Sequence, residues 1–231
     1  MTWIGSLYRS ALGKKAVMAV TGIFIFGWVF GHMVGNAKMY MGAEHFNEYA
    51  KWLRTMGAPA LPQIFGSSAG LWIVRILFIV AAWFHIQAAT QLTLMNWSAR
   101  PVDYNDRDYV EASYASRTMR WGGVIILLFI LYHLAQFTWG WRVAPAAFVE
   151  GDPYHNVVAG FQVWWVSAIY IIANLALGLH LFHGLWAMFN SLGLNNERFN
   201  PWKRYFATTF AIIVAGVNIS FPIAVLMGIV H

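Results

Sequence analysis

Five long runs of apolar residues make up most of the chain and are separated by shorter polar segments. The runs cover approximately residues 16–38, 69–95, 121–141, 161–189 and 206–229. A helix needs about 20 mostly apolar residues to cross the hydrocarbon core of a bilayer. The pattern therefore predicts an all-α membrane protein, a bundle of five transmembrane helices. Because the connecting segments are too short to hold a separate soluble unit, we expect a single domain over residues 1–231.

A shorter segment, approximately from Ala43 to Arg54, has the pattern of an amphipathic helix. Phe46, Tyr49, Ala50 and Leu53 would share one side of it, as apolar residues do on a surface helix. We expect this helix to lie along the outer membrane interface. An ordered loop is the alternative.

The composition agrees with a membrane protein and restricts its chemistry. Hydrophobic residues make up 59% of the chain and charged residues only 10%, against about 25% charged residues in a soluble domain. The chain contains no cysteine, which excludes cysteine-ligated iron–sulfur clusters, disulfides and covalently attached haem within it. Any haem would have to be a b-type haem, held by its ligands and by packing.

The basic residues favour one orientation in the membrane. Ten of them precede the first run or lie in the second and fourth connections: Arg9, Lys14, Lys15, Arg100, Arg107, Arg117, Arg120, Arg198, Lys203 and Arg204. Four lie in the first and third connections: Lys38, Lys51, Arg54 and Arg142. The positive-inside rule then predicts a cytoplasmic N-terminus, an outside C-terminus and a first span that is a retained signal anchor in the cell inner membrane. The net charge of +6 reflects this topology and lipid headgroups, and does not indicate nucleic-acid binding.

Each of the first four runs contains a histidine in its later half: His32, His85, His133 and His180. An ionisable side chain inside a membrane is costly, so it usually faces the bundle interior and has a function. Chain direction alternates between spans, which pairs His32 with His133 near one face and His85 with His180 near the other. Two histidines from facing helices are the axial ligands that a low-spin haem iron takes. The sequence therefore predicts two haems b with these four metal ligands. Hydrogen bonding between helices is the alternative role.

The remaining histidines are weaker candidates. His183 lies three residues after His180, nearly on the same helical face, so spacing alone leaves it open as a ligand or as a neighbour of the haem or its propionates. His45, His155 and His231 fall in connections or at the last position, where surface positions are expected. Glycines near two candidate ligands could let a flat macrocycle and neighbouring backbones approach closely: Gly27, Gly31, Gly35, Gly178 and Gly184.

Three short segments carry a family resemblance. They are GAEHFNEYA at Gly42–Ala50, RWGG at Arg120–Gly123 and HLFHGLW at His180–Trp186. Together with the order of the four histidines, they make essentially the whole chain resemble the cytochrome b subunit of succinate:quinone oxidoreductases and fumarate reductases, in its single-chain, five-helix, dihaem form. In that family the first histidine of the third segment is the ligand, which favours His180 over His183.

The resemblance implies a division of labour within a larger complex. A FAD-containing flavoprotein would oxidise succinate or reduce fumarate, and an iron–sulfur subunit would relay the electrons. This chain would be the membrane subunit of that enzyme, without catalytic residues of its own, and would exchange electrons with a membrane quinone, with menaquinone as the expected species. His85 and His180 would hold the haem nearer the clusters, and His32 and His133 the more distant haem. The complex could also form a higher oligomer.

Polar residues at the inner ends of the spans are candidates for contacts with haem propionates or the quinone. Arg120 is the first choice for a propionate, and Ser116, one helical turn earlier, is a candidate hydrogen-bond donor to a propionate or quinone. Lys14, Lys15 and Arg117 could act in the same way or pair with the iron–sulfur subunit. For each basic residue, plain positive-inside charge is the alternative.

No acidic residue falls within an apolar run. All nine lie in the connections: Glu44, Glu48, Asp103, Asp106, Asp108, Glu111, Glu150, Asp152 and Glu197. Some dihaem members of the family carry a glutamate two residues before the fourth ligand, thought to move protons across the membrane. This chain has Gly178 there, so a carboxylate pathway is not evident.

Two other classes of protein remain open at this point. One is the cytochrome b subunit of another quinone-linked respiratory enzyme, of the hydrogenase or formate dehydrogenase type. The other is a haem-free membrane anchor or a transporter, in which the histidines serve protons or helix packing. A reduced-minus-oxidised optical spectrum would separate the haem-containing classes from the haem-free one.

Overall fold

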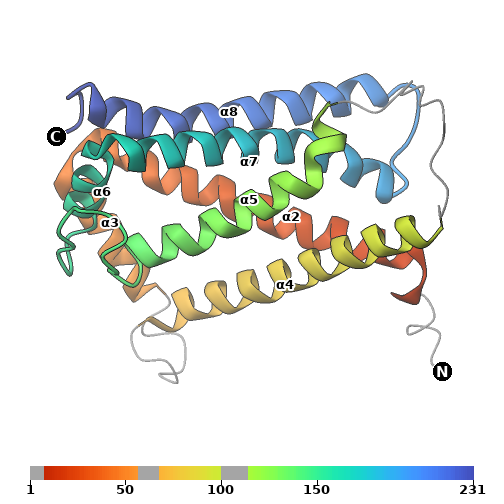
Figure 1. Ribbon diagram of the computed structural model, residues 1–231, viewed down its shortest axis with the longest axis horizontal. Coiled ribbons are helices and arrows are strands. Elements are labelled where there is room, and N and C mark those ends of the chain that lie inside the picture. The colour runs from red at the N-terminus through yellow and green to blue at the C-terminus, as the bar shows by residue number, and fades with distance from the viewer. Residues whose placement is uncertain (1–7, 57–67, 100–113) are drawn as a thin grey trace.

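A computed structural model shows five long helices lying side by side (Figure 1). The structure describes residues 8–56, 68–99 and 114–231, with the backbone alone for 114–118. The long helices are α2 (Ala11–Asn36), α4 (Ala69–Ser98), α5 (Tyr114–Phe137), α7 (Trp164–Ser191) and α8 (Asn200–Leu226). All five contain a stretch long and apolar enough to cross a membrane, and the described residues include no β-strand. The predicted all-α bundle of five spans is therefore confirmed.

Short helices close one end of the bundle, which we call the α6 end; the opposite end, where α2 begins, is the loop end. The short elements are η1 (Ala37–Met41), α3 (Ala43–Thr55) and α6 (Pro153–Gln162), and Figure 1 shows α3 and α6 together. The amphipathic helix predicted from the sequence is thus confirmed as α3. Its apolar side packs on the bundle: Phe46 is buried, and a Cβ on Gly35 of α2 would lie only 2.7 Å from the Tyr49 ring. The absence of that Cβ lets α3 approach α2.

A corner between α6 and α7 differs from the sequence prediction, which began the fourth span at residue 161. Val163 is extended, with φ −81° and ψ 107°, and separates the two helices. The hydroxyl of Ser167 donates to the carbonyl of Phe161 at 2.6 Å and holds this corner. Apart from Gln162, the residues directly on both sides of the corner are apolar, so the apolar pattern did not reveal it.

Pairwise packing divides the long helices into two groups. α4 packs mainly against α2, whereas α7 packs against both α5 and α8, and contacts between α2 and α7 join the groups. Small or β-branched residues fill the closest approaches, and Val166, Val214 and Ala207 are fully buried. The close packing of α7 on both sides makes it the central helix of the bundle.

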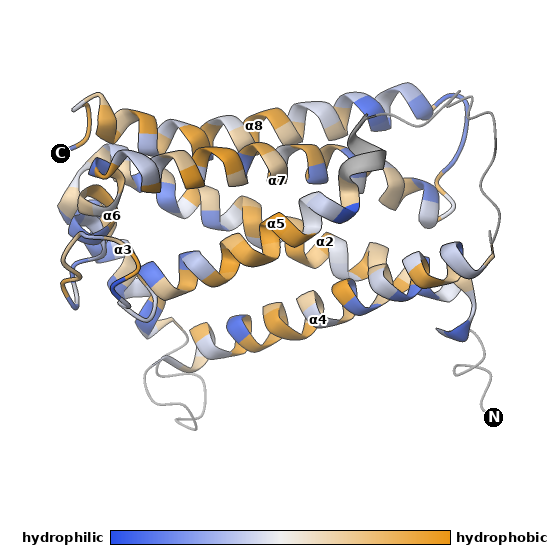
Figure 2. Cartoon of the chain, in the orientation of Figure 1, coloured by the Kyte–Doolittle hydropathy of each residue, from blue (hydrophilic) through white to orange (hydrophobic). Residues whose placement is uncertain are grey.

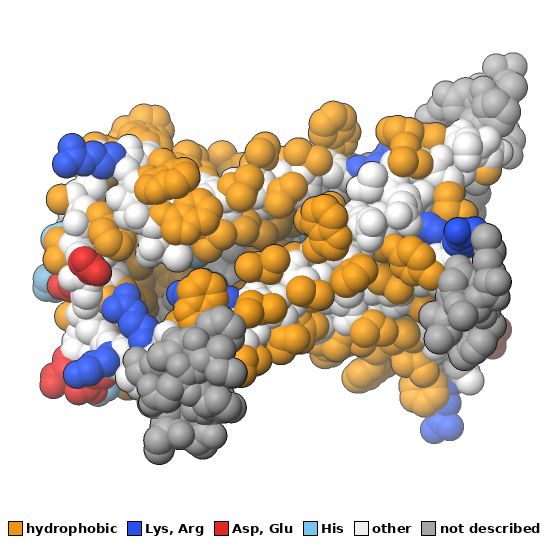
Figure 3. Space-filling model, turned by 90° about the horizontal axis from the view of Figure 1, so that it is seen from below, with side chains coloured by type: hydrophobic (Ala, Val, Ile, Leu, Met, Phe, Trp, Pro, Cys, Tyr) orange, Lys and Arg blue, Asp and Glu red, His pale blue; other side chains and the backbone are white. Residues whose placement is uncertain are grey.

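The outer surface of the bundle is apolar along its length. Large side chains are exposed on every long helix, including Ile79, Leu128 and Ile212. Orange hydrophobic segments continue along the helices in Figure 2, and Figure 3 shows hydrophobic side chains over the middle of one face with most charged side chains toward the two ends. Such an extensive apolar surface needs a non-aqueous surrounding. The chain is therefore a multi-pass membrane protein.

Two lysines expected as inner-face charges are buried at the loop end. The ammonium of Lys203 donates to Asn190 Oδ1 at 2.9 Å and to the Leu194 carbonyl at 2.8 Å, and its side chain is only 2% exposed. Lys14 is also buried and donates to two main-chain carbonyls of the preceding turn, each at 3.0 Å. Both cations thus satisfy main-chain or amide oxygens near helix ends, in addition to any effect on topology.

Asp152 caps the N-terminus of α6 and links it to α3, so a substitution there tests what stabilises the α6 end. Asp152 Oδ1 accepts from the main-chain nitrogen of His155 at 3.0 Å and from Asn47 Nδ2 of α3 at 2.9 Å. We expect Asp152→Ala to destabilise this end by about 0.5–2 kcal/mol, as loss of an N-cap does, and Asp152→Asn to have a much smaller effect. Hydrogen–deuterium exchange of the α6 amides in detergent measures the difference. Equal exchange in the two variants would contradict the capping role.

The same contacts predict a pH dependence. The hydrogen bonds from His155 and then from Asn47 hold the pKa of Asp152 below its usual value. Its stabilising contribution is therefore complete above the pKa of an unfolded aspartate, about 3.9, and is lost as the pH falls through the lower folded value. The excess exchange of Asp152→Ala over the wild type should shrink correspondingly in strongly acidic buffer.

Candidate functional site: two pairs of histidines

The structure brings the four intramembrane histidines together as two pairs. The ring centroids of His32 on α2 and His133 on α5 are 5.8 Å apart, with an angle of 86° between the ring planes. Those of His85 on α4 and His180 on α7 are 6.4 Å apart, at 58°. These are the two pairings that the alternating direction of the spans predicts. Ligation itself remains a prediction.

The two pairs lie at different levels of the bundle. His32 and His133 each lie four residues before the end of their helix at the α6 end, or about 6 Å along it. His85 and His180 lie thirteen and eleven residues before the ends of α4 and α7 at the loop end, or about 17–20 Å. The second pair is therefore deeper than the apolar runs indicated, because both helices continue beyond those runs.

The spacing of each pair suits an ion between the rings. A metal about 2 Å from one nitrogen of each imidazole would hold the centroids about 6 Å apart, close to the two observed separations. Each pair also joins helices that are not among the main packed partners, α2 with α5 and α4 with α7. His32 is exposed and the other three are half-buried, so protein atoms do not enclose the rings.

The hydrogen bonds of His85 determine which of its nitrogens can bind a metal. Its Nδ1 lies 3.1 Å from the Met18 carbonyl and 3.3 Å from Thr21 Oγ1. The carbonyl can only accept, and the Thr21 hydroxyl already donates to the Val17 carbonyl at 2.7 Å. Nδ1 of His85 must therefore carry the proton, which leaves a lone pair on Nε2.

His133 has the same tautomer for a different reason. Its Nδ1 lies 3.2 Å from the phenol oxygen of Tyr170. The single phenol proton is donated to Gln136 Oε1 at 3.1 Å, so the phenol oxygen accepts from Nδ1–H of His133. Here too Nε2 keeps its lone pair, which is the state of a ligating imidazole.

His180 is distinguished from its neighbour His183. The ring of His180 is the one that pairs with His85, whereas His183 lies against Trp186 with centroids 6.0 Å apart. Nδ1 of His180 is buried without a hydrogen-bond partner among the described residues. The geometry thus agrees with the preference for His180 that the resemblance gave.

Two imidazoles do not complete a site for a bare metal ion. A protein-bound zinc, for example, takes four ligands, and within the described ranges no group of three or more His, Cys, Asp or Glu side chains lies together. A haem supplies the other ligands from its macrocycle and needs only axial ligands from the protein. The residues present therefore fit a haem better than an isolated ion.

The candidate glycines divide into two kinds. A Cβ on Gly27, Gly31 or Gly184 would meet no atom within 4 Å, so open space adjoins each. At Gly178 a Cβ would lie 3.0 Å from the Cβ of Ala215 on α8, and Gly35 faces α3 as described above. Gly35 and Gly178 therefore allow neighbouring helices to approach closely, whereas room for a macrocycle beside Gly27, Gly31 and Gly184 remains a prediction.

The predicted propionate residues lie at the loop end. Arg120 is exposed, and its guanidinium carbon lies 5.4 Å from the ring centroid of Trp97 at the end of α4. Ser116 lies on the α5 backbone, but its side chain falls outside the described residues, as does that of Arg117. Lys15 is exposed, whereas the Lys14 ammonium is engaged as described above. Arg120 thus remains available for an anionic group at this end.

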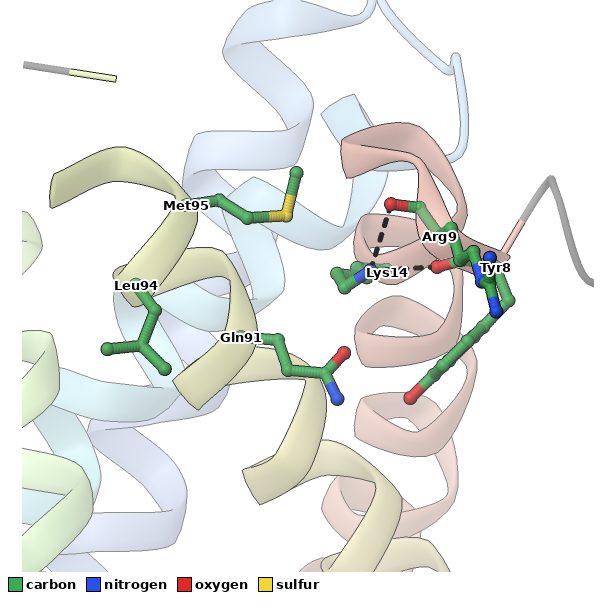
Figure 4. Close-up of a pocket in the computed structure, with 6 residues that line it drawn as sticks. All are labelled: Tyr8, Arg9, Lys14, Gln91, Leu94 and Met95. Carbon is green, nitrogen blue, oxygen red and sulfur yellow. Dashed lines mark hydrogen bonds between the residues drawn. The ribbon is translucent and has the colours of Figure 1, made fainter. Parts of the chain in front are cut away.

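A cavity of about 550 Å³ opens at the loop end between the start of α2 and the end of α4. Its lining comprises Tyr8, Arg9, Lys14, Gln91, Leu94 and Met95, and Figure 4 shows Gln91 of α4 extending toward the side of Lys14 on α2 and of Tyr8 and Arg9, which precede α2. Gln91 lies six residues after His85, or about 9 Å nearer the loop end along α4. The cavity combines basic and apolar side chains, as a site for an amphipathic molecule does.

Sequence reasoning missed the residues that support the histidines. Tyr170 and Gln136 lie in apolar runs, where a tyrosine and a glutamine carry no distinctive signal by themselves. Gln136 lies three residues after His133, a spacing that places the two on one helical face. That spacing could have identified Gln136, whereas Tyr170 is brought to the site by the packing of α7 on α5.

One comparison with known proteins identifies the family. Residues 104–219 match the model of the succinate dehydrogenase/fumarate reductase transmembrane subunit. This segment is half of the chain and contains α5, α6, α7 and most of α8, including His133, Tyr170 and His180. No curated protein and no solved structure gave a significant match. On the extent of the family match, the chain belongs to the succinate dehydrogenase/fumarate reductase transmembrane subunits.

Proposed function

We propose that this subunit is a dihaem cytochrome b that carries electrons between an iron–sulfur subunit and a membrane quinone, with menaquinone as the expected species. The observation that carries the proposal is the pairing of His32 with His133 and of His85 with His180 at separate levels and at similar ring separations. Family membership supports the same role, because the family forms the membrane part of the enzyme. Succinate oxidation would lie in the partner flavoprotein.

The protein's part is to hold and orient the cofactors. Haem iron supplies one-electron chemistry when bound. The Met18 carbonyl and the Tyr170 phenol fix the His85 and His133 rings and keep Nε2 unprotonated. Tyr170 and Gln136, which support His133, are buried, so water does not screen their hydrogen bonds.

The proposal includes an orientation of the subunit in the membrane, which is inferred from the distribution of its lysines and arginines. The basic connections belong to the loop end, which would face the cytoplasm and the iron–sulfur subunit. The His85–His180 pair would then be the inner pair, and the His32–His133 pair the outer pair. All residues from 1 to 231 would form this one membrane domain.

A reduced-minus-oxidised spectrum of the purified complex tests the proposal. We expect the bands of low-spin haem b, with two haems per chain by extraction and quantification. A spectrum without haem would instead support a haem-free anchor. Co-purification with a flavoprotein distinguishes this enzyme from a hydrogenase or formate dehydrogenase, which the family match already disfavours.

Arg120 is proposed to pair with a propionate of the inner haem. We expect Arg120→Gln to weaken retention of that haem during purification, because a charge-assisted hydrogen bond contributes more than a neutral one. Arg204→Gln is a matched control, since Arg204 is also exposed near the loop end. The measurement is the haem-to-protein ratio after extended washing. Equal ratios in the two variants would assign Arg120 to topology alone.

A further inference from the structure

The two histidine pairs differ in what supports them, and this difference has a consequence if the proposed function holds. In the inner pair, His85 donates to a main-chain carbonyl. In the outer pair, His133 donates to a side chain, the phenol of Tyr170. The main-chain carbonyl of Met18 would be present whatever residue stood at position 18. The phenol hydroxyl, in contrast, is present only because residue 170 is a tyrosine. We infer that Tyr170 sets the midpoint potential of the outer haem through the His133 imidazole.

Burial makes the contact between Tyr170 and His133 effective. Tyr170 is 5% exposed and packs in an aromatic group with Phe129, Phe137 and Phe161, whose ring centroids lie 4.9–5.8 Å from its own. Water therefore does not compete for the phenol oxygen. The ring is held in place by packing on three sides, so the hydroxyl is positioned independently of any cofactor.

The phenol is also polarised by its own acceptor. Tyr170 donates to Gln136 Oε1 at 3.1 Å, and Gln136 is buried. A hydroxyl that donates a hydrogen bond becomes a better acceptor for the next one, because successive hydrogen bonds polarise one another. Gln136 cannot move away easily, since its Nε2 lies against Gly160 of α6, where an added Cβ would be 2.6 Å from it. The series of hydrogen bonds from His133 through Tyr170 to Gln136 is thus held in place by packing at Tyr170 and at Gln136.

The sign of the effect follows from electron donation. Accepting the Nδ1 proton raises the basicity of the imidazole and makes Nε2 a stronger donor. A stronger axial donor stabilises the more positive, oxidised iron, and second-shell hydrogen bonding is one of the protein's means of tuning haem potential. Tyr170 therefore lowers the potential of the outer haem. Tyr170 is a positioning residue, since it acts through His133.

The test is a redox titration of the complex with Tyr170→Phe. The variant keeps the buried ring and removes only the hydroxyl, so we expect two haems per chain and a positive shift of one midpoint potential, with the other unchanged. Gln136→Leu should shift the same haem in the same direction by less, because the phenol oxygen remains. This second variant also keeps the inference testable if the first one retains too little haem.

Tyr132→Phe is a matched control. Tyr132 lies beside His133 on the same helix, its ring centroid is 6.2 Å from that of Tyr170, and its hydroxyl has no hydrogen-bond partner in the described part of the chain. Loss of this hydroxyl should leave both potentials unchanged. A positive shift equal to that of Tyr170→Phe would mean a general effect of polarity and would overturn the inference.

A His180→Ala background assigns the shift to one haem. It should retain only the outer haem, which can then be titrated alone with Tyr170 or Phe at position 170. A complex without any haem in the wild type would refute the proposed function. An unchanged or lower potential of the retained outer haem would refute the role of Tyr170 and leave the proposed function intact.

Discussion

Replacement of His85 or His180 by alanine is expected to remove the inner haem and to leave the outer one in place. Replacement of His32 or His133 is expected to do the reverse. Each haem should depend on both members of its pair, because a six-coordinate low-spin iron needs two axial ligands. Haem content should therefore fall from two to one per chain in each single variant. Quantified haem and the low-spin optical bands are the measurements.

His183 provides the internal control for this experiment. It lies on the same helix as His180 and is also half-buried, so His183→Ala tests the loss of an intramembrane imidazole that is not paired with another. We expect both haems to remain in this variant. Retention of both haems in His180→Ala, with loss of one in His183→Ala, would transfer the fourth ligand position to His183.

Quinone reaction near the outer pair should make turnover sensitive to the membrane potential. One charge that crosses a potential of 100 mV is worth about 2.3 kcal/mol, or roughly fifty-fold in an equilibrium constant. Charge that moves from the inner to the outer pair crosses a large part of the bundle. All nine carboxylates lie outside the spans, so the helices offer no carboxylate relay for compensating protons. We expect succinate oxidation by a low-potential quinone to be driven by the membrane potential and slowed by an uncoupler.

Liposomes that contain the whole complex and a potential-sensitive dye provide the measurement. The dye should report a potential during turnover of the wild type, and His133→Ala, which lacks an outer ligand, should abolish it. A wild-type complex that turns over without any change in potential would show that the quinone reacts near the inner pair. The cavity at the start of α2 would then be the place to examine for quinone.

Position 178 shows why a carboxylate pathway cannot be restored simply by mutation. Some relatives carry glutamate at the corresponding position, but in this chain the backbone there lies against Ala215 of α8. A glutamate would have to displace α8 before it reached either histidine pair. We therefore expect Gly178→Glu to disturb the packing of α7 on α8 without making turnover independent of the potential.

The sequence predicted the spans and the histidine pairing because both depend on properties that the chain displays locally. Apolar runs of membrane length define helices, and the alternation of chain direction alone places His32 beside His133. The corner at Val163 could not be predicted in this way, because only a single polar residue, Gln162, interrupts the apolar run there. The ends of the apolar runs also precede the observed ends of α4 and α7 by two or three residues. The runs therefore predict a position for the His85–His180 pair that is nearer the loop end than the observed one.

The supporting residues depend on packing that no local pattern encodes. Tyr170 meets His133 because α7 packs against α5, and the Met18 carbonyl meets His85 because α2 packs against α4. A main-chain carbonyl has no sequence signature at all. The glycines illustrate the same limit, since Gly31 adjoins open space and Gly35 contacts a neighbouring ring.

The attachment of α4 has a consequence for how the subunit matures. α4 packs mainly against α2, and its link to α7 runs through the His85–His180 pair. A ligand that binds only the assembled pair stabilises the assembled state by mass action, as metal binding does when its site is absent from the unfolded chain. Haem insertion would therefore complete the bundle during biogenesis. Without haem, α4 would keep its packing on α2 but would lose the link to α7 that protein contacts alone supply only weakly.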